Sequence, residues 1–431
     1  MQYIQYQSEK DLERIIARPT LDSNDLLPAV QEIMNKIKTN GDNALIELTE
    51  KFDGTKPRSI CIEKDQIEAS STVISSELKQ AIELAAANIK KFHSAQNPKT
   101  LEVEVTPGVN CSQKAVAIEK VGLYVPGGTA PLFSSVLMLA IPAVLAGCKE
   151  IVLCTPPNRQ GKVPEPMLYA AKVAGLKKIY CVGGAQAIAA MTFGTETIPK
   201  VDKILGPGNQ YVTAAKQLAF LQGTAIDMPA GPSEVLVIAD ETSNPAFVAA
   251  DLLSQAEHGV DSQVILVCTS NSQIRAINKE IEQQLEILPR KLIATEALKN
   301  STTVLVSDLE EAMFISNSYA PEHLIIASEN FESISPKVTN AGSVFLGNLT
   351  PESAGDYASG TNHTLPTNMA ARAFSGVNMD TFMKKITFQQ ITEKGVQNIG
   401  EAVFTMALNE ELQAHANAML LRLNSIQNPL T

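Results

Sequence analysis

Short runs of β-branched and apolar residues alternate with amphipathic or alanine-rich stretches of roughly a dozen residues along much of the chain. The runs include EIVLC, KKIYCV, EVLVIAD, QVILVC and HLIIA. Such alternation is typical of βα units on a mostly parallel sheet, because parallel strands need a crossover between them. The units form two series, residues 121–226 and 234–346, separated by the Pro/Gly segment MPAGPSE at 228–234. The sequence therefore predicts an α/β fold with two similar sheet domains.

Helical periodicity flanks this α/β region on both sides. Residues 25–39, 42–52 and 76–95 carry apolar residues at helical spacing, with a break at Gly41. Beyond Phe374 the helical period returns and ends in NEELQAHANAMLLRLNSI. We therefore expect helical extensions at the two ends, the last of which packs either on its own chain or on a partner.

Composition narrows the class of function. The chain has 35 Lys and Arg against 46 Asp and Glu, a formal charge of −11, and no Trp, which disfavours nucleic acid as a partner. The longest apolar stretch, residues 133–148, is short for a bilayer span and contains Pro and Ser. The start of the chain has no readable secretory signal, and the six cysteines lack CxxC spacing. We expect a mature chain that begins at Met1, in the cytoplasm, with reduced thiols and no membrane partner.

Glycine-rich turns follow predicted strands at residues 125–131, 182–188 and 206–212. Turns of this kind at the carboxyl ends of parallel strands direct backbone N–H groups towards an anion such as a pyrophosphate or a small acid. They also occur as plain tight βα turns, but three in one domain favour a ligand. A complete GxGxxG motif is missing, because Tyr211 stands where its third glycine would fall. Dinucleotide binding is therefore compatible with the sequence without being established by a motif.

The chain has only five histidines. His93 ends a charged helix and is expected at the surface. The other four follow residue 250 in polar segments, with further candidate ligands beside three of them: Gln255 with His258, Asp356 with His363, and Glu410 with His415, while His323 follows Glu322. Gln255 and His258 are three residues apart, which places both on one face of a predicted helix ending at Gly259.

Two imidazoles, a carboxylate and an amide carbonyl are suitable ligands for a borderline cation such as Zn²⁺ with an open position for substrate. These residues come from separate elements, so structural histidines remain the alternative. The adjacent pair Glu322 and His323 follows Pro321, where the chain is extended before a strand. A carboxylate beside an imidazole can divide two proton transfers, although a solvated Glu beside a capping His has the same spacing.

A cysteine nucleophile is the rival chemistry. Cys148 and Cys154 lie in a helix end and a strand, and only Lys149 beside Cys148 could lower a thiol pKa. Covalent catalysis by cysteine is therefore the less favoured hypothesis.

Seven segments, taken in order, resemble the histidinol dehydrogenase family. They are VGLYVPGGTAPLFSSVLMLAIPAVLAGC, VGGAQAIAA, KILGPGNQYV, MPAGPSEVLVIAD, DLLSQAEHG, NSYAPEHL and GDYASGTNHTLPT. The resemblance covers most of the chain. It implies two similar, incomplete Rossmann-like parallel-sheet domains: a first α/β domain from residues 24–123 and 232–375, and a second, NAD-binding domain from 124–231. It further implies a helical extension at 1–23 and a C-terminal segment, 376–431, that supplies dimer contacts and metal ligands.

The same resemblance implies an activity. Members of this family would oxidise L-histidinol to L-histidine through L-histidinal, a four-electron reaction with NAD and one Zn²⁺ per subunit that ends histidine biosynthesis. An interlocked homodimer is implied as well. The open questions are whether the zinc is a Lewis acid or only positions substrate, and which subunit supplies each ligand.

Carried over residue by residue, the resemblance assigns roles to single positions. The implied catalytic pair is Glu322 and His323. The implied metal ligands are Gln255, His258, Asp356 and His415; the substrate contacts are Ser233, Gln255, His258, His323, Asp356, Glu410 and His415; and the NAD contacts are Tyr124, Gln186 and Asn209. His363 lies in a family motif and is expected to line the site. Glu411 departs from the family pattern, because it stands where a glycine is usual between Glu410 and Leu412.

Two alternatives stay open at this stage. One is a dehydrogenase of another amino alcohol, because the same residues recognise an alcohol, an amine and a metal. The other is a non-catalytic binding protein built from two α/β domains, in which the Glu322–His323 pair would have no purpose.

Overall fold

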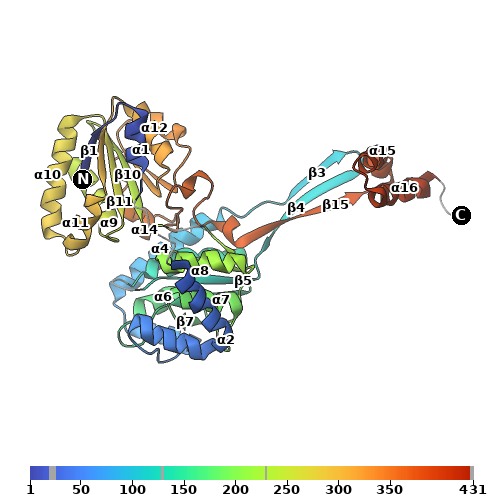
Figure 1. The fold of residues 1–431 in the computed structure, drawn as a ribbon, viewed down its shortest axis with the longest axis horizontal. Coiled ribbons are helices and arrows are strands. Elements are labelled where there is room, and N and C mark those ends of the chain that lie inside the picture. Colours follow the sequence, from blue (N-terminus) through green and yellow to red (C-terminus); the bar gives the residue numbers. More distant parts are fainter. Residues whose placement is uncertain (19–25, 128–130, 229–230, 428–431) are drawn as a thin grey trace. The chain divides into compact units, whose positions relative to one another are not determined.

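The computed structural model describes residues 1–18, 26–127, 131–228 and 231–427. They form two compact units (Figure 1). The first comprises residues 1–96 and 119–382, and the second residues 97–118 and 383–431. Parts of the predicted turns at 125–131 and 228–234, and of the predicted extension at 1–23, lie outside the described residues.

The first unit contains two six-stranded sheets. All strands of the first sheet are parallel, in the order β1 (Gln2–Gln5), β12 (Thr302–Leu305), β11 (Gln263–Cys268), β10 (Glu234–Ala239), β13 (His323–Ala327) and β14 (Ser343–Leu346). The three strands β10, β11 and β13 are buried along their whole length. Helices cover both faces of a parallel sheet, which explains why these strands are continuous apolar runs.

Two helix layers enclose this first sheet. One core joins alternate side chains of β10, such as Val235 and Val237, to α9 (Pro245–Ala256), α10 (Asn271–Ile287) and α11 (Lys291–Lys299). The other joins Leu236 and Ile238 to α1 (Glu9–Ile16), α12 (Leu309–Tyr319) and α13 (Phe331–Ile334).

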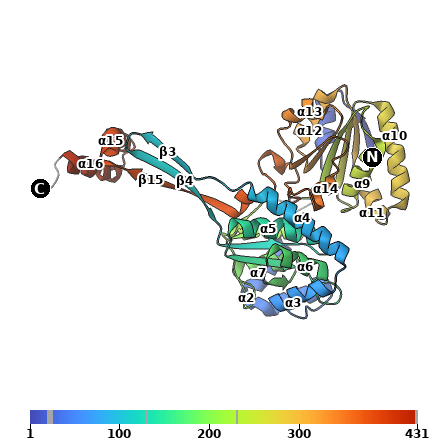
Figure 2. The same ribbon diagram turned by 180° about the vertical axis from the view of Figure 1, so that it is seen from behind.

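The second sheet has the order β2 (Cys61–Ile62), β7 (Ile179–Cys181), β6 (Glu150–Thr155), β5 (Lys120–Tyr124), β8 (Lys203–Leu205) and β9 (Ala225–Ile226). Its strands are parallel except for β2, which is antiparallel to β7. Helices α2 (Leu26–Asp53), α7 (Gly184–Phe193) and α8 (Gln210–Leu221) share its core. A second group, α3 (Lys64–Ala69), α4 (Ser76–Ser94), α5 (Phe133–Ala146) and α6 (Glu165–Ala174), packs side by side (Figure 2). The two predicted series of βα units thus form two sheets.

The packing differs from the expected division of the chain in two places. Residues 2–5 form an edge strand of the first sheet, where a helical extension was expected. Helix α2 packs on α7 and α8, so it shares a core with the sheet of residues 120–226 and not with that of 234–346. The predicted break at Gly41 is confirmed, since its φ of 51° and ψ of −133° interrupt α2. His93 is buried, contrary to expectation, and its Nδ1 hydrogen-bonds to the Ile89 carbonyl oxygen at 2.9 Å.

The second unit is a three-stranded antiparallel sheet with two helices. The strands lie in the order β15 (Met383–Ile391), β4 (Val109–Ala117) and β3 (Leu101–Thr106), and the helices are α15 (Glu393–Asn409) and α16 (Gln413–Gln427). Residues 383–391 were expected to be helical; they instead pair along their whole length with β4. None of the helices in the described ranges is long and apolar enough to cross a membrane.

Glu411 adopts the left-handed backbone conformation, with a φ of 60°, between α15 and α16. A side chain in this region strains the backbone by about 1 kcal/mol, which explains why a glycine would suit this position. We expect Glu411→Gly to raise the free energy of unfolding by about 0.5 kcal/mol, because relief of strain exceeds the entropy that glycine adds to the unfolded chain. Thermal denaturation would measure the effect. The matched variant Asn409→Gly, inside the last turn of α15, should be destabilised instead.

Candidate active site

The predicted catalytic pair lies at the amino edge of the first sheet. His323 is the first residue of β13, and Glu234 is the first residue of the neighbouring strand β10. The register pairs Val235 with His323, so these two strand starts are adjacent. Ser233 immediately precedes Glu234, and its carbonyl oxygen accepts a hydrogen bond from the Gln263 N–H at 3.1 Å.

The backbone of Glu234 orients both members of the pair. Its N–H donates to Oε2 of Glu322 at 2.9 Å, and its carbonyl oxygen lies 3.1 Å from Nδ1 of His323. Since a carbonyl can only accept, Nδ1 of His323 carries the proton. Nε2 of His323 is buried without a hydrogen-bond partner among the described residues and lies 3.7 Å from Oδ1 of Asp356. This nitrogen is therefore the one left to exchange a proton.

The surroundings shift the pKa values of the pair strongly. Burial raises the pKa of Glu322 to about 8. Burial alone would lower the pKa of His323, but the charges of Glu352, Glu322 and Asp356 outweigh it and raise that pKa to about 10. Burial also raises the pKa of Glu352 to about 8. The site is a buried group of carboxyls in which one imidazole is the central positive charge, and such shifts are common at catalytic centres.

Three side chains beside this pair could hold a metal ion. Ligand atoms of His258, Glu352 and Asp356 all lie within 4.8 Å of one another. Glu352 and Asp356 are four residues apart on α14 (Glu352–Tyr357), so their side chains project from one face of that helix. His258 follows the end of α9, which is reached at Ala256 rather than at the predicted Gly259. The structure thus brings together His258 and Asp356, two of the four predicted ligands, adds Glu352, and places a third predicted ligand, Gln255, against Glu352.

Gln255 lies against the same group. With its amide oriented to satisfy both neighbours, its nitrogen donates to the Glu352 carboxylate and its oxygen accepts from the Glu234 N–H at 3.1 Å. One rotation of the amide would instead turn its oxygen towards the carboxylates, where a cation would be needed between them. An imidazole, two carboxylates and an amide oxygen are ligands that a divalent ion such as Zn²⁺ accepts. The residues present therefore fit such an ion.

His363 is engaged on both ring nitrogens. Nδ1 lies 2.9 Å from the Asp356 carbonyl oxygen, and Nε2 lies 2.9 Å from Oγ of Ser135 on α5. Burial lowers the pKa of His363. A neutral imidazole that donates to the carbonyl and accepts from the hydroxyl accounts for both contacts. His363 thus orients the segment that carries Asp356 and has no nitrogen left for a metal.

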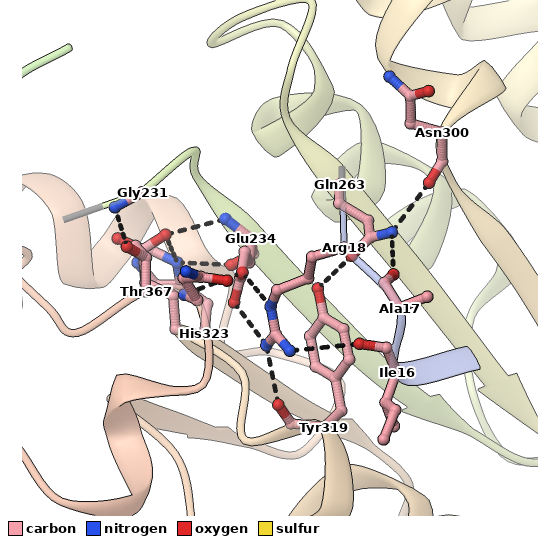
Figure 3. A network of polar contacts seen from close by, with 12 residues as sticks. Ile16, Ala17, Arg18, Gly231, Glu234, Gln263, Asn300, Tyr319, His323 and Thr367 are labelled. Carbon is pink, nitrogen blue, oxygen red and sulfur yellow. Dashed lines mark hydrogen bonds and ion pairs between the residues drawn. The ribbon is translucent and has the colours of Figure 1, made fainter. Parts of the chain in front are cut away.

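Glu234 forms a buried ion pair with Arg18 (Figure 3). The Arg18 guanidinium donates to both carboxylate oxygens of Glu234, at 2.5 and 3.0 Å, and to the Tyr319 carbonyl oxygen at 2.8 Å. It also stacks on the Tyr319 ring at 3.9 Å. The Tyr319 hydroxyl donates to Gln263, whose amide nitrogen in turn donates to the carbonyl oxygens of Ala17 and Asn300. The N-terminal segment thereby fixes the peptide that orients Glu322 and His323.

We expect Arg18→Met to lower the free energy of unfolding by about 3–5 kcal/mol, because it leaves the buried Glu234 carboxylate without its cation. Urea denaturation would measure the loss. The double variant Arg18→Met with Glu234→Gln should recover part of it, because no buried charge is then unpaired. Equal stability of the single and double variants would show that the ion pair does not carry the effect.

The three predicted cofactor residues line one pocket at the carboxyl edge of the second sheet. Tyr124 ends β5, Gln186 lies in the first turn of α7, and Asn209 caps α8 by accepting from the Tyr211 and Val212 N–H groups. The pocket has a volume of about 1160 Å³. The Tyr124 hydroxyl accepts from the Gly184 N–H at 3.0 Å, while Nε2 of buried Gln186 has no hydrogen-bond partner among the described residues. An orphan buried donor in a pocket is a sign of a ligand that supplies an acceptor.

A second buried ion pair holds the glycine turn at 206–209. Lys216 pairs with Asp227, and both are nearly inaccessible to solvent. The Lys216 ammonium donates to the Gly206 carbonyl oxygen at 3.0 Å, and the Gly206 N–H donates to Asp227 at 2.8 Å. Gly206 has a φ of 123°, and a Cβ there would lie 2.0 Å from the Tyr124 carbonyl oxygen. Only glycine therefore lets this turn approach β5 closely enough to form the pocket.

Two predicted residues belong to the other unit of the chain. Glu410 and His415 belong to the second unit, as the C-cap of α15 and a residue of α16. The rival thiol chemistry finds no support, since burial raises the pKa of Cys148 to about 11 and also raises that of Cys154.

Three polar residues at the site were not singled out from the sequence. Arg18 and Glu234 are 216 positions apart, so nothing local connects them. Glu352 could have been found, because its spacing from Asp356 places both on one helical face.

Two mostly parallel sheets, a pocket at glycine turns and a buried imidazole–carboxylate group define an α/β enzyme. The family model "Histidinol dehydrogenase" matches residues 16–423. The histidinol dehydrogenase of Bacteroides thetaiotaomicron is 55% identical over 427 residues, covering 99% of this chain and 100% of the relative. That of Vibrio parahaemolyticus is 49% identical, covering 97% of each chain. The crystal structure of the histidinol dehydrogenase from Elizabethkingia anophelis superposes with a TM-score of 0.97 at 55% identity and covers 99% of each chain. The chain belongs to the histidinol dehydrogenase family of oxidoreductases.

Proposed function

We propose that this enzyme oxidises L-histidinol to L-histidine through L-histidinal, with NAD⁺ as the acceptor in both steps, as the last reaction of histidine biosynthesis in the cytoplasm. The observation that carries the proposal is the match of almost the whole chain to histidinol dehydrogenases. The buried Glu322–His323 pair supports it, because a four-electron oxidation needs two kinds of proton transfer.

Two bound groups belong to this proposal. Tyr124, Gln186 and Asn209 would hold NAD⁺ in the pocket of the second sheet. Gln255, His258, Asp356 and His415 would hold one Zn²⁺ per subunit, with Glu352 beside them. When bound, NAD⁺ accepts a hydride and the ion fixes the imidazole and amine of the substrate. Ser233 and Glu410 would contact the substrate, Glu410 through a charge-assisted hydrogen bond to its ammonium group.

His323 and Glu322 would divide the proton transfers. The charges of Glu352 and Asp356 help to raise the pKa of His323; a cation held by these carboxylates would offset them, and Nε2 of His323 would accept the proton of the substrate hydroxyl. Glu322 would accept a proton from the water that adds to the aldehyde while Nε2 of His323 returns its proton to the carbonyl oxygen, which produces the gem-diol needed for the second oxidation. Nε2 of His323 would then accept a proton again. The Glu234 peptide keeps both groups in place during the two steps.

A second copy of the chain is the partner we propose for the second unit. In the single chain, β3 exposes Leu101, Val103 and Val105. Leu101 and Val103 share one face of the strand, and Val105 lies at a register irregularity between Glu104 and Thr106. Large apolar side chains of this kind are normally covered. A homodimer would cover them, and light scattering after size exclusion would measure its mass.

An absorbance assay of NADH formation tests the proposed reaction. The purified chain, loaded with zinc, is mixed with NAD⁺ and histidinol while absorbance near ~340 nm is followed, and two NADH per histidinol are expected. An amino alcohol without the imidazole is the matched control. Equal turnover of that analogue would favour a general amino-alcohol dehydrogenase, and absence of NADH with both would favour a non-catalytic binding protein.

A further inference from the structure

Asp53 is a carboxylate in the pocket of the second sheet, and its Oδ2 has no hydrogen-bond partner among the described residues. It is the last residue of α2, and it lines the pocket together with Tyr124 and Gln186. Its Oδ2 is closed off from water, and no described group donates a hydrogen bond to it. The residue before it, Phe52, is half exposed and lines the same pocket. Asp53 therefore lines the pocket without making a hydrogen bond to any of the described residues through Oδ2.

Its position is unfavourable for the folded protein on two counts. The carboxyl end of a helix carries partial negative charge, so an anion there is repelled. Burial also raises the pKa of Asp53 to about 6, which reflects the cost of removing its charge from water. A group that costs stability and makes no hydrogen bond to the part of the chain that the structure describes is a candidate for binding a ligand.

The residues that line the pocket include both hydrogen-bond acceptors and hydrogen-bond donors for a ligand. Among the described residues that line it, Asp53 is the only carboxyl and Arg159 the only guanidinium. The unpartnered Nε2 of Gln186 is a donor that calls for an acceptor on the ligand. Asp53 calls for the opposite, a pair of neutral hydrogen-bond donors, and it repels phosphate. The charge of Asp53 is also among the causes, after burial, that raise the pKa of Tyr124, which places the two groups near each other.

We propose that Asp53 accepts hydrogen bonds from the 2′- and 3′-hydroxyls of a ribose of the dinucleotide and thereby selects NAD⁺ against its 2′-phosphorylated form. The inference rests on the proposed use of NAD⁺ and deepens it. A vicinal diol offers two donors at the spacing of a carboxylate, and such charge-assisted bonds are about twice as strong as neutral ones. A 2′-phosphate would remove one donor and place a second anion against Asp53.

The test measures binding without turnover. Calorimetry compares the dissociation constants of NAD⁺, NADP⁺ and nicotinamide hypoxanthine dinucleotide, which lacks the adenine amino group, for the wild-type holoenzyme and for Asp53→Asn and Asp53→Ala. Glu50→Gln, an exposed carboxyl on the same helix, is the control. We expect Asp53→Ala to weaken NAD⁺ binding about tenfold. Both Asp53 variants should lower the ratio of the NADP⁺ to the NAD⁺ constant by about tenfold or more, because the repulsion is gone. The control should change neither.

Three other outcomes would each refute a different part of the proposal. Unchanged NAD⁺ and NADP⁺ constants in both variants would refute the role of Asp53 alone. Loss of discrimination against the hypoxanthine analogue would assign Asp53 to the adenine amino group instead of the diol. A wild-type enzyme that binds no NAD⁺ would refute the proposed cofactor as well. Asp53→Asn should also raise the melting temperature of the free enzyme, and a fall would show that the carboxylate has a structural role.

Discussion

Replacing His258 by asparagine is expected to remove the divalent ion and to lower histidinol oxidation by more than about 100-fold. The reason is the closeness of the ligand atoms of His258, Glu352 and Asp356, which fall within 4.8 Å of one another. Without the imidazole, the group is left with mutually repelling carboxylates and an amide. Metal content after dialysis and initial rates on the same samples would measure both effects.

Matched variants separate the metal site from general damage. His415→Asn should behave like His258→Asn if the second unit supplies the fourth ligand, and Glu352→Gln should weaken metal affinity if its carboxylate takes part. Glu257→Gln, next to His258 but not in the ligand group, should keep both metal and activity. Full activity in a demonstrably metal-free His258→Asn enzyme would contradict the proposed site.

The core of the fold could be predicted because its central strands are apolar after their first residue. Strands β10, β11 and β13 are buried on both faces, so after a polar first residue each is an unbroken apolar run. The strands that escaped prediction are edge or exposed ones. β15, with the sequence MKKITFQQI, is exposed along most of its length, and its partner β4 lies far away in sequence. Pairing of this kind leaves no periodic signal in either segment.

The candidate site likewise combines residues that are neighbours in sequence, which could be predicted, with residues that are distant in sequence, which could not. Glu322 and His323 are neighbours in the chain, so their joint chemistry could be predicted from a short segment. The part that orients them could not, because it depends on Arg18 reaching Glu234 across the first sheet and on the Glu234 peptide bonding to both catalytic groups. The prediction for His93 was wrong in its burial. A histidine in a charged helix was expected in solvent, yet its face of α4 is buried.

Glu322→Gln is expected to slow the oxidation of histidinal by about 10²–10⁴-fold while affecting the oxidation of histidinol to histidinal much less. The amide keeps an oxygen to accept from the Glu234 N–H, so the position of the side chain is preserved, but it cannot take a proton from water. Single-turnover rates with each substrate would measure the two steps, and the variant should release histidinal. Glu329→Gln, exposed beyond the other end of the same strand, is the control.

The pH dependence provides a second, independent check on Glu322. Burial raises the pKa of this carboxyl to about 8, so at lower pH it is protonated and cannot act as a base. The rate of histidinal oxidation by the wild type should therefore rise with pH as Glu322 loses its proton, and this rise should be absent in Glu322→Gln. Because His323 serves both steps and Glu322 only the second, the proposed division predicts unequal losses. Equal losses with histidinol and histidinal, with an unchanged pH profile, would mean that one group performs both proton transfers.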